Sequence, residues 1–260
     1  MADELIVKLD EEVARLYLNR PDQRNAMTPE LVDELLEALD EVEAEDEIRC
    51  VVITGMGKAF CAGFDVSRIP SATGTEAREA ARMVEKLGLR VRGLRMPVIA
   101  MVNGPASGAG CDLAVSCDVR IASSAAKFAM PPARLGVLYD EGGMRRLLQT
   151  VGLAAAKELL LTGELIEADR ALELGLVNRV VGPDRLEDTT KHFVRTIVEN
   201  APLSVAASKL ACNVIADAAP LPPDAQTLLD HAAERVWGSE DAAEGPAAFK
   251  ERRQPRFRGR

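Results

Sequence analysis

Two segments of the same design constrain the fold of this chain more than any other feature. Residues 51–65 (VVITGMGKAFCAGFD) and 98–113 (VIAMVNGPASGAGCDL) each begin with an apolar, β-branched run and continue through small residues into a predicted helix. Small residues let a ligand approach the main chain closely. The free N–H groups at a helix start can then face an anion. The pair therefore predicts either an oxyanion hole built from two main-chain donors or two tight turns packed against a sheet.

Other glycine-rich sites are excluded by spacing. The second segment lacks the third glycine of a dinucleotide fingerprint, and neither segment continues into the Gly-Lys-Ser/Thr of a P-loop. A donor in an oxyanion hole contributes ~3–4 kcal/mol to a transition state, so the hypothesis has large functional consequences.

Alternation of strands and helices predicts an α/β fold. Residues 4–9 and 13–18 alternate apolar and polar side chains, as in a hairpin, and Thr28 followed by Pro29 is typical of a helix start. Further strands are expected at 49–54, 97–102, 119–122 and 127–129, and a helix at about 75–95. From about residue 186 the pattern is helical, over 186–200, 203–216, 225–237 and 241–251. We predict a core over residues 1–195 and a helical C-terminal region over 196–260.

Charge and cysteine content exclude several functions. The net charge of −9 argues against a nucleic-acid partner, although the basic stretch 250–260 is either a solvated end or an anion contact. No apolar run approaches the ~18 residues of a membrane span, and the acidic start does not resemble a signal peptide. Five cysteines without a Cys-x-x-Cys pair predict reduced thiols in a cytoplasmic protein. The two histidines, His192 and His231, lie in different predicted helices, so we expect no metal site.

Four motifs carry a resemblance to a known family. They are NRPDQRNAM at 19–27, AFCAGFD at 59–65, VNGPASGAGCDL at 102–113, and the pattern LTG…A…A…GLVN over 161–178. In this order they closely resemble the enoyl-CoA hydratase/isomerase (crotonase) family, from about residue 4 to the C-terminal tail. The resemblance implies a ββα spiral core with a helical trimerisation region. It also implies a homotrimer or a hexamer made of two trimers, a coenzyme A thioester as substrate, and no cofactor beyond the CoA of that substrate.

The resemblance also assigns binding residues. It places the two oxyanion donors at the N–H groups of Ala62 and Ala109. The family usually has glycine at the second position, so the Ala109 donor requires backbone dihedrals that accept a Cβ. The residues implied to contact substrate or CoA are Arg24, Ala26, Ala62, Gly63, Phe64, Asp65, Phe249 and Arg252. Phe249 and Arg252 resemble positions that reach the CoA of a neighbouring subunit.

The acid/base residues depart from the family pattern. Hydratases of the family use two glutamates, which correspond to Asp112 and Pro132. A proline cannot transfer a proton, so Tyr139, Asp140 and Glu141 are the next candidates. Dienoyl-CoA isomerases of the family have aspartates at the positions of Asp112 and Asp140. The alternative interpretations are an N-cap for Asp140, a first-turn acid for Glu141 and a buried hydrogen-bonding group for Asp112.

Three functional hypotheses follow. The leading one is a hydratase or isomerase of an unsaturated acyl-CoA that uses Asp112 with Asp140 or Glu141. The second is an acyl-CoA decarboxylase, because residues 131–139 resemble methylmalonyl-CoA decarboxylases, in which a tyrosine stands at the position of Tyr139; Tyr139 as a packing residue is the alternative. The third is a non-catalytic acyl-CoA-binding protein, suggested by Pro132 and Ala109. Cys61 has no histidine nearby in sequence and is interpreted as a small buried hydrophobe.

Overall fold

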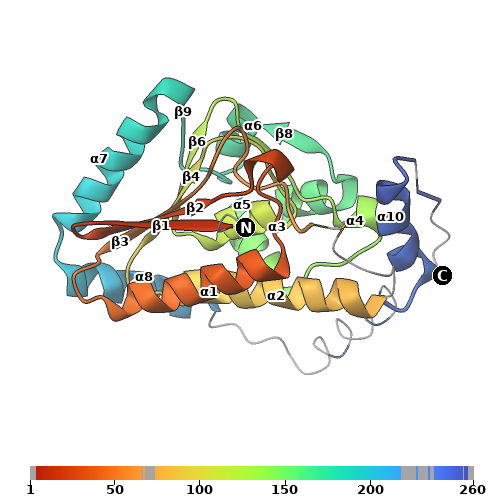
Figure 1. The fold of residues 1–260 in the computed structure, drawn as a ribbon, viewed down its shortest axis with the longest axis horizontal. Helices are drawn as coiled ribbons and strands as arrows, with labels where there is room; N and C mark the ends of the chain where they lie inside the picture. The colour runs from red at the N-terminus through yellow and green to blue at the C-terminus, as the bar shows by residue number, and fades with distance from the viewer. Residues whose placement is uncertain are drawn as a thin grey trace.

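A twisted six-stranded sheet forms the centre of the computed structural model, which describes residues 4–65, 67, 74–217, 227, 234, 237–253 and 255–256. Its strands follow the order β1-β2-β3-β4-β6-β9 (Figure 1). Their bounds are β1 Leu5–Asp10, β2 Val13–Leu18, β3 Cys50–Gly55, β4 Val98–Val102, β6 Val119–Ser123 and β9 Arg179–Val181. Strands β1 and β2 form the predicted antiparallel hairpin, and every other neighbouring pair is parallel. The α/β class is confirmed, and so are the predicted strands of this sheet, which are all of these except β9.

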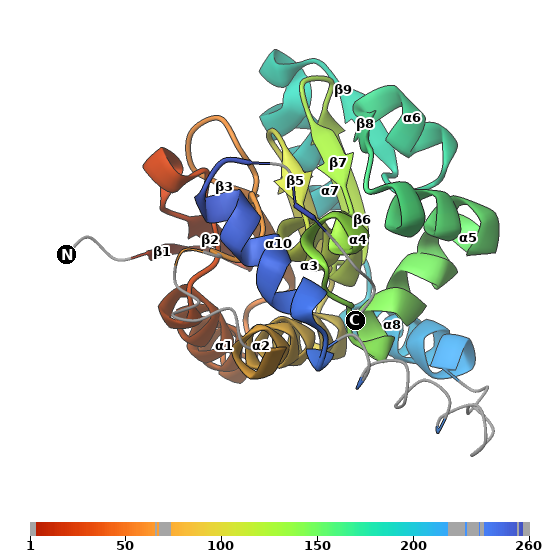
Figure 2. The ribbon, with the colours of Figure 1, turned by 90° about the vertical axis from the view of Figure 1, so that its right-hand side faces the viewer.

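A small second sheet stands beside the first (Figure 2). It contains β5 (Ala106–Ser107), β7 (Lys127–Ala129) and β8 (Leu165–Glu167). Strand β7 pairs in parallel with β5 and antiparallel with β8. Strand β7 was predicted, whereas β5, β8 and β9 were not.

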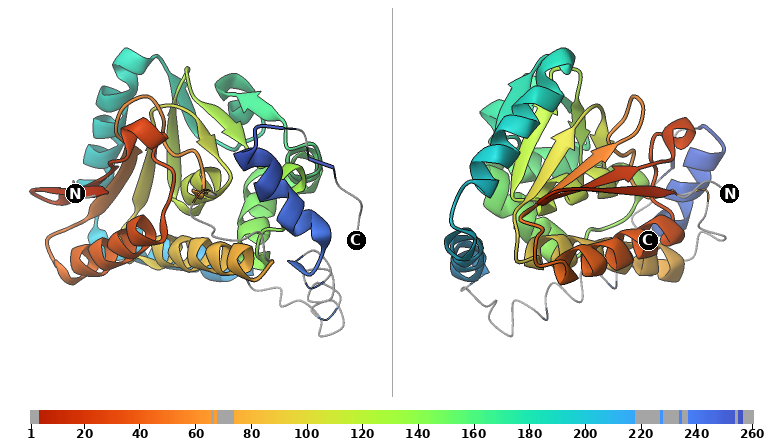
Figure 3. Two further views of the ribbon diagram at one scale, coloured as in Figure 1. Left: turned by 45° about the vertical axis from the view of Figure 1, so that its right-hand side comes forward. Right: turned by 60° about the vertical axis from the view of Figure 1, so that its left-hand side comes forward.

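Helices cover both faces of the large sheet (Figures 1 and 3). On one face, α1 (Pro29–Ala44), α2 (Gly74–Gly93) and α3 (Ala109–Ser116) pack against strand residues such as Val51 and Ile53. On the other, α7 (Leu186–Val198) packs against Val52 and its neighbours. Successive strand side chains thus enter two separate cores. The predicted cap of α1 is confirmed, because the Thr28 hydroxyl accepts from the Leu31 N–H at 3.0 Å.

The remaining elements are shorter or lie toward the C-terminus. They are η1 (Pro21–Gln23), α4 (Pro132–Leu135), α5 (Glu141–Thr162), α6 (Ala168–Glu173), η3 (Pro183–Arg185), α8 (Pro202–Asp217) and α10 (Glu240–Lys250). The predicted boundary at 195/196 falls inside α7, a helix that packs on β3, β4 and β6. Helix α8 has no buried residue. The predicted helix 225–237 lies mostly outside the described residues. No helix in the described part of the chain is long and apolar enough to cross a bilayer.

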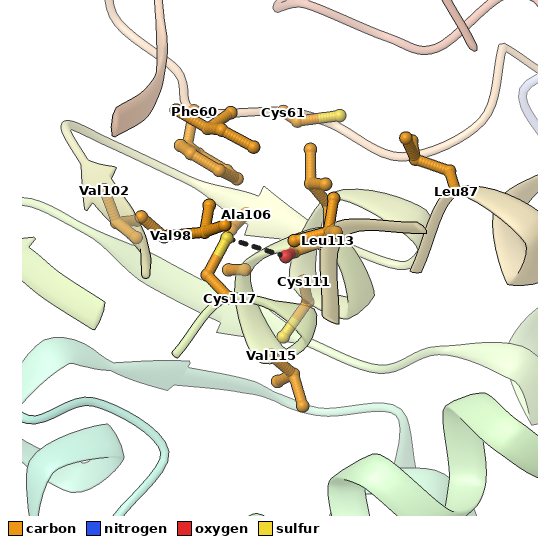
Figure 4. Close-up of a cluster of buried hydrophobic side chains, with 14 of the residues drawn as sticks. Phe60, Cys61, Leu87, Val98, Val102, Ala106, Cys111, Leu113, Val115 and Cys117 are labelled. Atoms are coloured by element: carbon orange, nitrogen blue, oxygen red, sulfur yellow. Dashed lines mark hydrogen bonds between the residues drawn. The ribbon is translucent and has the colours of Figure 1, made fainter. Parts of the chain in front are cut away.

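The two glycine-rich turns pack directly on each other. Figure 4 shows Cys61 of the first turn above Ala106 and the α3 residues Cys111 and Leu113. A Cβ added to Gly110 would lie 2.2 Å from the Cys61 carbonyl oxygen, far inside van der Waals contact. A Cβ on Gly63 would lie 2.9 Å from the Ser107 carbonyl oxygen. Main chain therefore touches main chain at this point, and only glycine permits it.

Replacing Gly110 by alanine tests this packing. The added methyl has no space against the Cys61 carbonyl, so we expect a destabilisation of about 1–3 kcal/mol from overpacking. The matched control is Gly93→Ala at the end of α2, where an added Cβ meets nothing within 4 Å. That control should be neutral or slightly stabilising. Urea unfolding of the two variants measures the difference, and equal stabilities would contradict the packing argument.

Candidate active site

A cavity of about 790 Å³ opens where the two turns meet. Its walls come from the turns themselves, from α2, from residues 131–140 and from α10, which packs on α4 (Figure 2). Most lining side chains are apolar. The ionisable side chains in its lining, within the described part of the chain, are Glu85, Asp112, Arg134, Tyr139 and Asp140. An apolar cavity with a few convergent polar groups is the usual form of a small-molecule site.

The start of α3 provides one main-chain donor. Ala109 is the first helical residue, so its N–H has no partner within the helix, and no described residue accepts it. The preceding Gly108 takes the unusual backbone angles, with φ 53° and ψ −123°. Because the strain falls on glycine and Ala109 is helical, the Cβ of Ala109 is accommodated. The requirement stated for this donor is met.

The other donor assignment must be corrected from Ala62 to Phe64. The Ala62 N–H already donates to the Arg24 carbonyl at 3.0 Å, so it is not available to a ligand. Phe64 forms a parallel bridge with Met27, in which the Gly63 carbonyl accepts from Met27 and the Asp65 N–H donates to Met27. Polar groups alternate sides along an extended chain, so the Phe64 N–H points away from Met27. It has no acceptor among the described residues, and Phe64 lines the cavity.

Gly63 brings the two donors together. A Cβ built on Gly63 would lie 3.6 Å from the Ala109 nitrogen, so the residue before Phe64 touches the start of α3. Gly63 itself has φ 103°, a region that side-chain-bearing residues avoid. Two N–H groups without an acceptor among the described residues, one of them at a helix N-terminus, thus belong to residues that line the cavity. This arrangement is able to hold a carbonyl oxygen that becomes negatively charged.

Asp112 lines the cavity but is already engaged. Its carboxylate is buried, and both oxygens accept from Arg146 Nη2, at 3.2 and 3.0 Å. Burial raises the pKa of Asp112, and the attraction of Arg146 opposes that rise. Arg146 also contacts Glu85 at 2.8 Å. Sequence reasoning missed Arg146 and Glu85, because nothing in the local pattern marks residues so far apart as partners.

Asp140 is a cavity carboxylate with one oxygen that no described residue binds. It lines the cavity and occupies the N-cap position of α5, as the N-cap interpretation expected, but its side chain makes no capping bond to that helix. Its Oδ2 is buried without a hydrogen-bond partner among the described residues. Burial raises the pKa of Asp140, and the charge of Glu85 raises it further. Arg82, Arg78 and Arg146 act in the opposite direction without reversing the shift.

Of the two other candidates, Tyr139 lines the cavity and Glu141 does not. The Tyr139 hydroxyl lies beside the turn that precedes α3, since a Cβ on Gly108 would be 3.5 Å from it. Burial raises the pKa of Tyr139 well above its ordinary value, so the phenol stays protonated. Glu141 instead forms an ion pair with Arg145 one turn along α5, and it does not line the cavity. Pro132 lines the cavity as the first residue of α4.

Of the eight residues expected to contact substrate or CoA, four line the cavity and four do not. Ala62, Gly63, Phe64 and Phe249 line the cavity, and the half-exposed Phe249 does so in its own chain. Four expected residues lie outside the lining: Arg24, Ala26, Asp65 and Arg252.

Two of those four, Arg24 and Asp65, have a local structural setting. Arg24 is exposed and has φ 52° at the end of η1. The Arg24 carbonyl binds Ala62, and Asp65 pairs with Arg20 at 3.3 Å.

Cys61 does not act as a nucleophile. Its thiol is fully buried, and burial raises its pKa to about 12. A thiol with such a pKa carries almost no thiolate at neutral pH. The interpretation of Cys61 as a small buried hydrophobe is confirmed.

Comparison with known proteins identifies relatives over nearly the whole chain. The sequence pattern of the family described as "Enoyl-CoA hydratase/isomerase" matches residues 8–260. A short-chain-enoyl-CoA hydratase of Clostridium acetobutylicum is 38% identical over 96% of this chain and 95% of its own length.

Two solved structures give the same fold. A methylmalonyl-CoA decarboxylase in complex with 2-nitronate-propionyl-CoA superimposes with a TM-score of 0.93 at 32% identity, covering 99% of both chains. An enoyl-CoA hydratase from Bacillus anthracis superimposes with a TM-score of 0.79 at 35% identity, covering 99% of this chain and 100% of the other.

The titration of Asp140 tests the electrostatics of the cavity. We expect its pKa to lie above the ~3.9 of an unperturbed aspartate. Glu85→Gln should lower that pKa because it removes a neighbouring negative charge, whereas Arg82→Gln should raise it because it removes a positive one. Carboxyl NMR of aspartate-labelled protein measures all three values. Shifts of the same sign in the two variants would show that these charges do not control Asp140.

Proposed function

The chain belongs to the enoyl-CoA hydratase/isomerase family, and from that premise we propose that it binds an acyl-CoA thioester and stabilises the enolate formed from it. The observation that carries the proposal is the pair of unpaired N–H groups of Phe64 and Ala109 at one end of an apolar cavity. The thioester carbonyl oxygen accepts from both donors. As charge develops on that oxygen, the donors and the α3 N-terminus stabilise it without reorganisation.

Proton transfer next to the thioester is assigned to Asp140. A group that takes and returns protons near neutral pH needs a raised pKa and room to reach the substrate. Asp140 meets both conditions, whereas the oxygens of Asp112 are bound by Arg146. The proposed reaction is isomerisation or hydration of an unsaturated acyl-CoA. Pro132 removes the second family carboxylate, so a two-glutamate hydration does not apply.

Decarboxylation is the second candidate, and a specific observation favours it. The solved methylmalonyl-CoA decarboxylase superimposes with a higher TM-score than the hydratase, and Tyr139 stands beside the donor turn. In this reaction the bond between Cα and the carboxylate breaks, and carbon dioxide leaves. The electron pair passes into the thioester enolate, so no base is required. The protonated Tyr139 phenol then orients the carboxylate or supplies the proton to Cα.

Assembly into a trimer or a hexamer is part of the proposal. Helix α8 contributes no buried residue, and Leu203 and Ile215 are 85% and 75% exposed. Such apolar exposure is typical of a helix that packs against another subunit. The chemistry proposed needs no cofactor apart from the CoA of the substrate, and the setting proposed is the cytoplasm.

Removing one donor tests the oxyanion hole directly. Phe64→Pro deletes the N–H, and Phe64→Leu keeps it while changing the side chain. We expect turnover to fall ~10²–10³-fold in the proline variant, the cost of losing one such donor. The leucine variant should change much less. Calorimetric binding of 2-nitronate-propionyl-CoA, an enolate mimic, provides a second reading of the same loss. Equal behaviour of the two variants would rule out Phe64 as a donor.

A substrate panel separates the two reactions. Enoyl- and dienoyl-CoAs should be hydrated or isomerised, with a loss of ~10²–10⁴-fold in Asp140→Asn and little change in Tyr139→Phe. Release of carbon dioxide from methylmalonyl- or ethylmalonyl-CoA that is lost in Tyr139→Phe would instead establish the decarboxylase. Binding of CoA thioesters without turnover of any would establish the non-catalytic hypothesis.

A further inference from the structure

Three charged side chains from three helices contact one another close to the first turn of α3, which carries the Ala109 donor. Arg146 of α5 contacts Asp112 of α3 at 3.0 Å and Glu85 of α2 at 2.8 Å. The side chains of Arg146 and Asp112 are each 4% exposed, and that of Glu85 is 19% exposed. The Glu85–Arg146–Asp112 cluster therefore joins the helix that carries the Ala109 donor to the two helices that flank the cavity.

Glycines make room for this cluster on two of the three helices. A Cβ on Gly88 of α2 would lie 2.6 Å from Arg146 Nη2. A Cβ on Gly142 would lie 1.8 Å from the Glu85 carboxylate. A Cβ on Gly143 would lie 3.3 Å from Asp112 Oδ1. The charged groups thus fill notches that side chains would otherwise occupy, so the arrangement is built into the helix packing.

Burying such charges is expensive, so their presence requires an explanation. A buried ion pair contributes little net stability compared with apolar residues of the same volume. What it provides is a fixed geometry. Asp112 lies in the first turn of α3, and its own N–H donates to the Gly108 carbonyl at 3.0 Å. Holding the Asp112 carboxylate from α5 therefore holds the turn in which the Ala109 N–H lies.

We propose that Arg146 is a positioning residue, which fixes the direction of the Ala109 N–H through its ion pairs with Asp112 and Glu85. Asp112 then anchors α3, the helix that carries the Ala109 donor, and does not transfer protons. This inference rests on the proposed function only in requiring that an enolate-like oxygen binds at the two donors. Donors lower a barrier only when they are fixed before the charge develops, and surrounding residues provide that support.

The test is Arg146→Lys, with Arg145→Lys as the matched control. Lysine keeps the charge but lacks the planar fork that spans two carboxylates. We expect kcat to fall about 10- to 100-fold, part of the ~10²–10³ that a whole donor contributes. KM for the thioester should change less than about threefold, because ground-state binding uses the rest of the cavity. Arg145 pairs with Glu141 away from the cavity, so its variant should keep both values.

Binding measurements separate this inference from the proposed function. Arg146→Lys should lose affinity for 2-nitronate-propionyl-CoA by the same 10- to 100-fold, while affinity for propionyl-CoA changes less than threefold. Equal loss for both ligands, or no loss, would overturn the positioning role. If the unaltered protein does not prefer the nitronate over propionyl-CoA, the enolate chemistry itself fails.

A second variant covers the case in which Arg146→Lys does not fold. Asp112→Asn keeps the shape of the side chain and leaves Arg146 paired with Glu85. If Asp112 only anchors α3, turnover should fall less than about tenfold. The preference for 2-nitronate-propionyl-CoA over propionyl-CoA should fall by a matching factor. A loss of ~10²–10⁴-fold with the nitronate preference intact is the signature of a proton-transfer group and would overturn the inference.

Discussion

The rest of the structure depends on main-chain contact between the two strand-to-helix turns. With no side chain between them, the Cys61 carbonyl rests on Gly110, and Gly63 rests on Ser107. This contact fixes the distance between the Phe64 and Ala109 donors, because the two main chains cannot approach more closely. Both turns follow neighbouring strands of the same sheet, β3 and β4, so the sheet fixes their relative height. The donors are therefore as rigid as the core itself, which is what electrostatic preorganisation requires.

The acidic groups of the cavity differ in their hydrogen-bond partners more than in their positions. Asp112 and Asp140 both line it, and burial raises the pKa of both. Arg146 holds Asp112 with two contacts, whereas one Asp140 oxygen is unpartnered among the described residues. In the proposed function, two carboxylates of one type thereby have different roles, one structural and one chemical. The protein has the fold of its family, and the proposed chemistry depends on which of the two acids has an unpaired oxygen among the described residues.

Much of the fold and part of the site were predictable from sequence. The hairpin, the Thr28 cap and the strands before each glycine turn are encoded locally, within one turn or one strand. A strand of two residues, such as β5, leaves no periodic signal. The first donor was misplaced by two residues because the N–H of Ala62 is consumed by Arg24, a contact across 38 positions in the sequence. Arg146 was missed for the same physical reason, since its partners lie on other helices.

Residues 136–140 belong to no helix or strand, yet they carry Tyr139 and Asp140 at the cavity. The donors, in contrast, are held by the sheet and by α3. In the proposed function, binding of the thioester and the choice of reaction thus depend on separate segments of the chain. In evolutionary terms, substitutions in the 136–140 connection alter the acid or the phenol without changing a helix or a strand. Such a division lets duplicated copies of one gene acquire new reactions on a common thioester, a few residues at a time.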